Sequence, residues 1–168
     1  MQNEIRIMSG GQTGVDRAAL DVAGKLGLAR GGWCPKGRLA EDGVIDASYP
    51  LVETPSASYE QRTMWNVRDA DATLIIAAHA PLTGGTRYTR TVAEGLRKPQ
   101  LVVVLEEQAS LAMTAEWLRR HEVRVLNVAG PRESGQPGIY RQAFTYLQAL
   151  LQLWIAPMAE RSTIEDNN

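Results

Sequence analysis

The sequence predicts an α/β fold, a three-layer Rossmann-like sandwich in which helices cover both faces of a mainly parallel sheet of about six strands. Three observations support this fold class. Short apolar runs alternate along the chain with segments whose apolar residues have helical spacing. The runs 72–78 and 101–105 are almost continuously apolar, as is typical of strands buried on both faces. Glycine-rich turns join two of the runs to the helices that follow them.

The first of these turns lies between an apolar run at 5–8 and a helical pattern that begins at Val15, and it contains Gly10, Gly11 and Gly14. Glycines let the backbone approach a ligand closely, and the N-terminus of a helix favours an anion. We therefore expect a phosphate or carboxylate here, and we expect Gly11→Val to block the ligand while leaving the fold intact. The alternative is a tight connection without a ligand, because the turn matches neither a Walker A sequence nor GxGxxG.

Asp16 and Arg17 open the predicted helix. An acid in the first turn is stabilised by the helix dipole, whereas a base is not. Arg17 should therefore have a specific partner, which is either the anion or a neighbouring carboxylate.

A strand candidate within 27–34 is followed by a polar loop at 34–43. Lys36 and Arg38 lie directly after the strand, where open α/β sheets place ligand-binding groups. A solvated loop without a ligand is the alternative. The chain then has a strand candidate at 49–53 and a helix candidate at 59–68, which contributes the polar residues Arg62 and Asn66.

The strand at 72–78 leads into a second glycine-rich turn at 81–89 and then into a helix. Its glycines and hydroxyls are Gly84, Gly85, Thr86 and Thr89. Two helix N-termini should therefore converge on one crevice at the carboxyl edge of the sheet.

The last part of the chain continues the alternation, with strands at 101–105 and 123–128 around a helix at 111–120. A loop at 130–138 follows, and the final helix begins near Pro137. Residues 1–156 should form a single Rossmann-like domain, and 157–168 a polar C-terminal tail.

The composition excludes several classes of partner and location. The 18 Lys and Arg residues are balanced by 19 Asp and Glu residues, so no overall positive field exists to hold nucleic acid. No apolar run has the length of a signal peptide or a membrane span. The single cysteine is compatible with the cytoplasm and excludes an internal disulfide. We expect a cytoplasmic homo-oligomer with a small phosphate-bearing ligand and with neither membrane nor nucleic acid as a partner.

Four loops and the flank of the 59–68 helix supply the candidate ligand-binding residues. The four arginines among them should meet in one crevice, where their guanidinium groups can hold phosphate oxygens. The complete set is Gly10, Gly11, Gln12, Thr13, Gly14, Asp16, Arg17, Lys36, Arg38, Arg62, Asn66, Gly84, Gly85, Thr86, Thr89, Arg132, Glu133 and Ser134.

Long motifs at 9–21, 31–38, 40–43 and 127–134 resemble the putative molybdenum carrier family. The middle segment at 62–73 is also similar to that family, so the resemblance spans nearly the whole chain. It implies kinship with the lysine-decarboxylase-like phosphoribohydrolases and the DprA-type proteins, and hence a nucleotide or a nucleotide-derived ligand.

One position departs from the phosphoribohydrolase motif Pro-Gly-Gly-x-Gly-Thr-x-x-Glu, because Thr89 stands where the catalytic Glu is expected. Glu94 lies more than a helical turn further on and is a poor substitute. Asp16, Glu41, Asp42 and Glu133 are the other carboxylates that could act as an acid or base.

Three functions remain. The first is a binding protein for molybdenum cofactor or a nucleotide, and the second is a nucleotide-processing enzyme such as an N-glycosidic phosphoribohydrolase. An NAD-dependent oxidoreductase ranks last, because the strand near Trp33 ends in Cys-Pro and not in an acidic residue. We expect Cys34 to be buried and not a ligand; the alternative is a thiolate that is activated by Lys36 and Arg38 or that contacts a soft metal. No protein metal site is expected, so any molybdenum would have to be held by its pterin.

Overall fold

The computed structural model describes residues 4–156. Its main sheet has five strands, all parallel, in the order β2-β1-β9-β7-β8. The strands are β1 (Arg6–Met8), β2 (Ala29–Gly31), β7 (Ala72–Ala77), β8 (Gln100–Val104) and β9 (Val125–Ala129). The parallel α/β architecture is confirmed. The strand number is lower than expected, because the 49–53 segment pairs outside this sheet. The tail expected at 157–168 lies outside the described residues.

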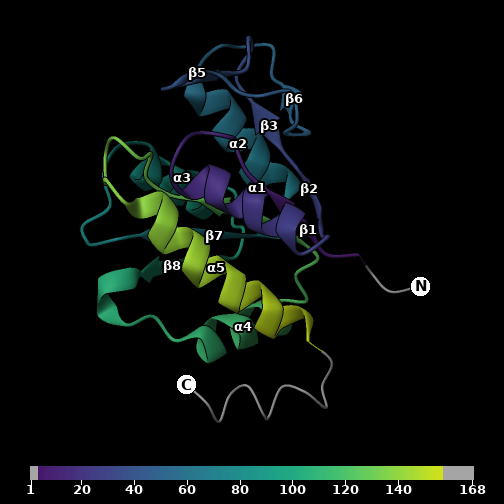
Figure 1. Ribbon diagram of the computed structural model, residues 1–168, viewed down its shortest axis with the longest axis vertical. Helices are drawn as coiled ribbons and strands as arrows, with labels where there is room; N and C mark the ends of the chain where they lie inside the picture. Colours follow the sequence, from purple (N-terminus) through teal and green to yellow (C-terminus); the bar gives the residue numbers. More distant parts are fainter. Residues whose placement is uncertain (1–3, 157–168) are drawn as a thin grey trace.

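Helices cover the sheet on both faces (Figure 1). One layer consists of α1 (Val15–Lys25), α5 (Ile139–Ile155) and α4 (Leu111–Arg120), in which α5 packs against both α1 and α4. The other layer consists of α2 (Tyr59–Asp69) and α3 (Gly84–Gly95), which pack against each other. A short 3₁₀ helix, η1 (Leu105–Glu107), follows β8. None of the helices within 4–156 has both the length and the apolar character needed to cross a bilayer.

The core lies between the sheet and the α1, α4 and α5 layer. All six residues of β7 are buried, and Leu74 and Ile76 pack in one cluster with Leu126 of β9 and Leu147 of α5. These side chains come from apolar runs and from one stripe of the last helix, so the hydrophobic pattern determines which residues form the core.

A small lobe stands above the main sheet at the top of Figure 1. It contains the parallel pair β3 (Trp33–Cys34) and β6 (Val52–Glu53), and the hairpin of β4 (Leu39–Ala40) and β5 (Gly43–Val44). Its own hydrophobic cluster consists of Leu20, Cys34, Ile45 and Leu51. The polar segment expected to be an irregular loop is thus partly a hairpin.

The strand order places the last strand of the chain between β1 and β7. The connection through α1 leaves β1 toward β2, whereas the connection through α3 leaves β7 toward β8. The connections therefore diverge in opposite directions from β9, and such a point opens a crevice beyond the carboxyl ends of the strands.

Candidate functional site

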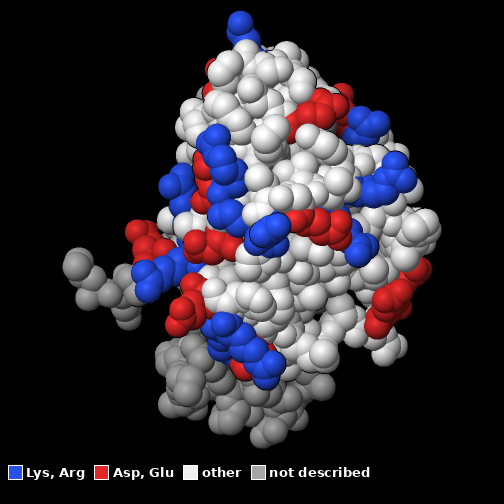
Figure 2. Space-filling view, turned by 180° about the vertical axis from the view of Figure 1, so that it is seen from behind, with Lys and Arg blue, Asp and Glu red and all other residues white. Residues whose placement is uncertain are grey.

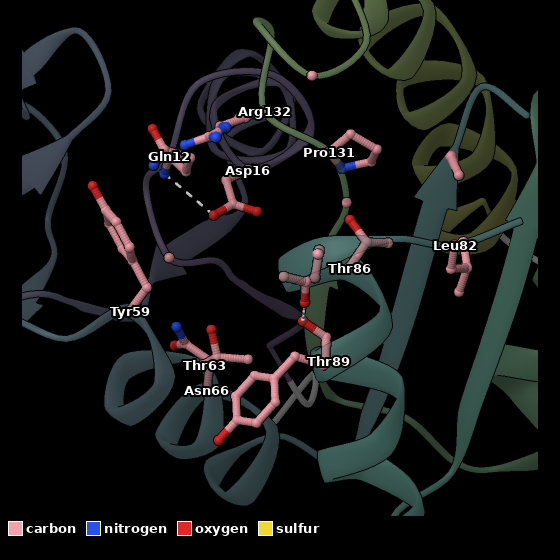
Figure 3. Close-up of a pocket in the computed structure, with 18 of the residues that line it drawn as sticks. Gln12, Asp16, Tyr59, Thr63, Asn66, Leu82, Thr86, Thr89, Pro131 and Arg132 are labelled. Atoms are coloured by element: carbon pink, nitrogen blue, oxygen red, sulfur yellow. Dashed lines mark hydrogen bonds between the residues drawn. The ribbon is translucent and has the colours of Figure 1, made fainter.

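A cavity of about 530 Å³ lies at this point, within the size range of small-molecule sites. Its walls come from the turn after β1, from α2, from the start of α3, and from β9 with the loop that follows it. Figure 3 shows Gln12, Asp16 and Arg132 on one side, with Tyr59, Thr63 and Asn66 of α2 on another. The predicted crevice at the carboxyl edge of the sheet is present.

The N-terminus of α3 forms one wall through Thr83, Gly84, Gly85 and Thr86. The first N–H groups of a helix have no partner inside the helix, and the first turn of α3 contains no acidic residue. Gly84 and Gly85 are exposed, and a Cβ atom added at either would meet no atom within 4 Å, so no other part of the described chain covers this end of the helix. An anion can therefore approach the end of the helix closely.

The turn after β1 is arranged differently, because three of its amides are already bonded within the chain. Gln12 N donates to Asp16 Oδ2 at 3.2 Å, Thr13 N to Gln12 Oε1 at 3.0 Å, and Val15 N to Pro131 O at 3.2 Å. Of the two glycine-rich turns, the one before α3 therefore offers the better anion site. Gly10 and Gln12 nevertheless line the cavity.

Gly11 and Gly14 face away from the cavity into tight packing. A Cβ atom at Gly11 would lie 2.4 Å from Leu51 Cδ1, and one at Gly14 would lie 2.3 Å from Pro131 O. Both glycines have positive φ, 76° and 78°, which side chains rarely adopt. The expectation that Gly11→Val would leave the fold intact is therefore wrong, since the new side chain would enter the core of the small lobe.

Asp16 and Arg62 form an ion pair in the cavity wall, with 2.8 Å between Oδ2 and the NH1 nitrogen. Burial raises the pKa of the Asp16 carboxyl, although the charge and hydrogen bond of Arg62 act in the opposite direction. The Arg62 guanidinium also lies 5.5 Å from the ring centroid of Tyr59. Its Nε is buried and has no hydrogen-bond partner among residues 4–156.

The four arginines expected in one crevice are not all there. Arg62 and Arg132 line the cavity, whereas Arg17 and Arg38 do not. Arg17 bonds both oxygens of Asp42, at 2.5 and 2.8 Å, so its partner is the neighbouring carboxylate and not the anion. Arg38 donates to four backbone carbonyls, those of Ile45, Asp46, Tyr49 and Leu51, and thereby fixes the shape of the small lobe.

Two predicted residues line the cavity but use their polar atoms elsewhere. Asn66 accepts from Trp33 N at 2.8 Å and donates to Trp33 O at 2.9 Å, which joins α2 to β3. The Thr89 hydroxyl donates to Gly85 O at 2.9 Å. By contrast, the hydroxyls of Thr63 and Thr86 have no hydrogen-bond partner in the described part of the chain, so they can bind a ligand.

The other predicted residues lie outside the cavity. Lys36 is exposed at the base of the hairpin. Glu133 accepts the N–H groups of Gly138 and Tyr140, at 2.5 and 2.9 Å, and so caps the start of α5. Thr13 and Ser134 both donate to Glu41. These residues support the loops around the cavity and do not face it.

Sequence reasoning missed several lining residues, including Tyr59, Thr63 and Tyr88. One signal could have found the first two, because positions 59, 62, 63 and 66 lie on one face of a helix that already contained Arg62 and Asn66. Tyr88 lies within the segment that was predicted as a turn, at 81–89, whereas α3 already begins at Gly84, so the prediction did not show which side of the helix it occupies.

Acidic residues at the cavity are few. Asp16 and Glu60 are the carboxylates among the described lining residues. Glu94 is exposed and bonds Arg90 at 2.9 Å, so it does not replace the absent catalytic Glu. Cys34 is buried as expected, and burial raises the pKa of its thiol. Within residues 4–156, no three His, Cys, Asp or Glu side chains are grouped closely enough to hold a metal ion.

The face of the molecule opposite to that of Figure 1 has mixed charge. On the face shown in Figure 2, basic and acidic side chains alternate, and neither sign forms a continuous stripe. This face therefore offers no extended basic surface for a polyanion.

Comparison with known proteins identifies the family. The model of the circularly permutated YpsA SLOG family matches residues 7–151. A solved structure of a putative molybdenum carrier protein from Syntrophus aciditrophicus SB is similar, with 44% sequence identity and a TM-score of 0.82, over 92% of this chain and 96% of that one. No curated protein matches the chain. The resemblance to the molybdenum carriers is thus confirmed, and the chain belongs to the circularly permutated YpsA SLOG family.

Proposed function

We propose that the chain binds a small phosphate-bearing ligand in the cavity, with the phosphate at the N-terminus of α3. The observation that supports this most directly is that the N-terminus of α3, which has no acidic residue in its first turn, lines the cavity through Thr83, Gly84, Gly85 and Thr86. Arg132 faces the same cavity and can add a charge-assisted hydrogen bond to the phosphate.

The rest of the ligand is a flat ring system that lies against the tyrosines. Tyr59 is 40% exposed, and Tyr88 also lines the cavity. Aromatic side chains stack on heterocycles with little dependence on the exact ring, and Arg62 near Tyr59 restricts the motion of that side chain. The hydroxyls of Thr63 and Thr86 supply hydrogen bonds that orient the ring or a sugar.

Molybdenum cofactor and nucleotides both combine a phosphate with a flat heterocycle. The name of the solved relative favours the cofactor, carried as cargo. The described lining residues fit the pterin and its phosphate, but they include no cysteine or histidine. The protein would therefore hold the organic part of the cofactor, and the pterin would hold the metal.

A second candidate function is N-glycosidic hydrolysis of a nucleotide, and Asp16 is the observation that favours it. This carboxylate lies inside the cavity and has a raised pKa, as acid and base catalysts often do. The ion pair with Arg62 and the Thr89 at the position of the motif's Glu make binding without reaction the better supported function.

Native mass spectrometry of freshly purified protein tests the proposal. A retained pterin or nucleotide is the expected result, and calorimetry with adenosine monophosphate (AMP) and with inorganic phosphate then measures affinity. Incubation with AMP, followed by chromatography for free adenine, tests the hydrolase. A protein that retains nothing and binds neither probe at millimolar concentration contradicts the proposed function.

A further inference from the structure

Glu41, at the tip of the β4–β5 hairpin, is bonded to two other loops. Its carboxylate accepts hydrogen bonds from the hydroxyls of Thr13 and Ser134, and from Ser134 N at 3.1 Å. Its own N–H donates to Gln12 Oε1 at 2.9 Å. The side chain is 18% exposed although it belongs to a surface hairpin. The tip is therefore fixed to the turn after β1 and to the loop after β9.

Both of these loops contribute to the cavity, through Gln12 and Arg132. Gln12 Oε1 accepts from Thr13 N and Glu41 N, which fixes the side-chain amide in one orientation. Arg132 Nε lies 3.5 Å from Glu41 Oε2. Among the described residues, Glu41 is the ion-pair partner of Arg132. Gln12 is thus oriented by the main-chain N–H of Glu41 and Arg132 by its carboxylate, although Glu41 does not itself line the cavity.

We propose that Glu41 is a positioning residue for the ligand site, holding Gln12 and the Arg132 guanidinium in the orientation in which they meet the ligand. The inference rests on the proposed function. Arg132 is 57% exposed and long, so without a partner it would lose side-chain entropy on meeting an anion. Glu41 contacts the Nε side and leaves the two terminal nitrogens of the guanidinium without a partner in residues 4–156.

The neighbouring acid has a different partner, which makes it a matched control. Asp42 bonds Arg17, whose Nε donates to Gly11 O at 3.1 Å, and neither Asp42 nor Arg17 lines the cavity. Asp42→Asn therefore removes a carboxylate from the same hairpin tip, with a similar loss of surface charge, and leaves the contacts of Gln12 and Arg132 in place.

The experiment measures AMP affinity by calorimetry for the wild type, Glu41→Gln, Asp42→Asn, Arg132→Ala and the Glu41→Gln/Arg132→Ala double variant. Glu41→Gln should weaken binding about tenfold, toward the lower end for a hydrogen bond to a charged group. The AMP affinity of Asp42→Asn should stay within about twofold of the wild-type affinity, the variation that is usual for a change at an independent site. In the Arg132→Ala background, Glu41→Gln should have a much smaller effect, because Glu41 acts largely through that arginine.

One contrary result is that Glu41→Gln reduces AMP affinity equally with and without Arg132, and another is that Asp42→Asn reduces AMP affinity as much as Glu41→Gln does. Either result would show only a general structural role and would overturn the inference. A second measurement does not depend on the ligand. In hydrogen exchange, Glu41→Ala should accelerate exchange at Ser134 N–H, and Asp42→Ala should not. Unchanged exchange at Ser134 refutes the positioning role even if AMP binds. A wild type that retains no ligand and binds neither AMP nor inorganic phosphate contradicts the proposed function, and the exchange measurement then decides by itself whether Glu41 orders the loops.

Discussion

Asp16 and Arg62 are joined across 46 positions of sequence by an ion pair of 2.8 Å, with side chains 5% and 13% exposed. Removing one member of a buried pair leaves the other charge uncompensated. We expect Arg62→Ala to lower the free energy of unfolding by about 3–5 kcal/mol in urea denaturation. Arg90→Ala, which breaks the exposed pair with Glu94, is the control and should change it by less than about 0.5 kcal/mol. Equal effects would show that the Asp16 pair is screened by water.

A methyl group added at Gly85 would meet no atom of the described chain within 4 Å. Gly85→Ala should keep or raise stability, because alanine favours a helix by about 1 kcal/mol over glycine. It should also weaken AMP binding at least tenfold, because the methyl group occupies the space of the phosphate. Gly95→Ala, in the same helix and with equally open surroundings, is the matched control and should bind normally. Normal binding by both variants would place the phosphate elsewhere.

Arg132 lines the cavity and Arg17 does not, so we expect their removal to affect AMP binding differently. Arg132→Ala should weaken AMP binding by about 1.5–3 kcal/mol, the usual contribution of a hydrogen bond to a charged group. Arg17→Ala should change it by less than about 0.5 kcal/mol, since distant sites behave independently. Calorimetry measures both. A large loss in Arg17→Ala with an intact fold would mean that the Asp42 pair opens when ligand binds.

Acid should loosen the hairpin tip. Burial acts to raise the pKa of Glu41, but hydrogen bonds from Ser134 and Thr13 and the charge of Arg132 outweigh it, so the pKa is lowered. The hydrogen bond and charge of Arg17 lower the pKa of Asp42. Groups with lowered folded pKa values stabilise above the unfolded values of about 3.9 to 4.3, and this stabilisation disappears as pH falls through the folded values.

The wild type should therefore be more stable than the Glu41→Gln/Asp42→Asn double variant at pH 7, and the difference should shrink at pH 3. Urea unfolding at both pH values measures it. A difference that is constant with pH would mean that neutral hydrogen bonds, and not the two charges, fasten the tip.

Gly11→Val should unfold the small lobe first. The new side chain would collide with Leu51 and Ile45 at a residue whose φ is 76°. Circular dichroism and thermal denaturation should show a strongly destabilised protein even without ligand. Gly27→Val is the control. Gly27 has a similar φ of 69°, but a Cβ atom added there would meet no atom within 4 Å, so this variant measures the cost of backbone strain without a collision. Equal losses would assign the whole effect to the backbone.

The sequence predicted the layers well because apolar periodicity is a local signal. The helix at 111–120 and the strand beginning at Ala72 were found at their observed positions. The cavity was also located, because polar loops after parallel strands meet at one edge. The partners of Arg17 and Arg38 could not be predicted. Arg17 bonds Asp42 and Arg38 bonds carbonyls at 45–51, and these groups are positioned by a hairpin that no periodic sequence pattern indicates.

Strand pairing was beyond local reasoning for a similar cause. Val52 pairs with Trp33 and not with the main sheet, and nothing in either two-residue strand distinguishes the two outcomes. The pairing of Val52 with Trp33 is stabilised by Arg38, which donates to Leu51 O, and by Leu51 and Cys34, which belong to one hydrophobic cluster. Tertiary contacts thus decide where short strands lie.

The position of β9 has a consequence for biosynthesis. As the chain leaves the ribosome, β1 can pair with β2 and β7 with β8, but Ile7 has to wait for Leu126 and Leu74 for Val128. Until then the nascent chain contains two half-sheets with open inner edges, and unpaired strand edges of this kind are prone to pair with other chains. β9 and the loop that follows it bring Asn127 and Pro131 to the cavity, so the cavity is complete only after part of the final quarter of the 168 residues has been translated.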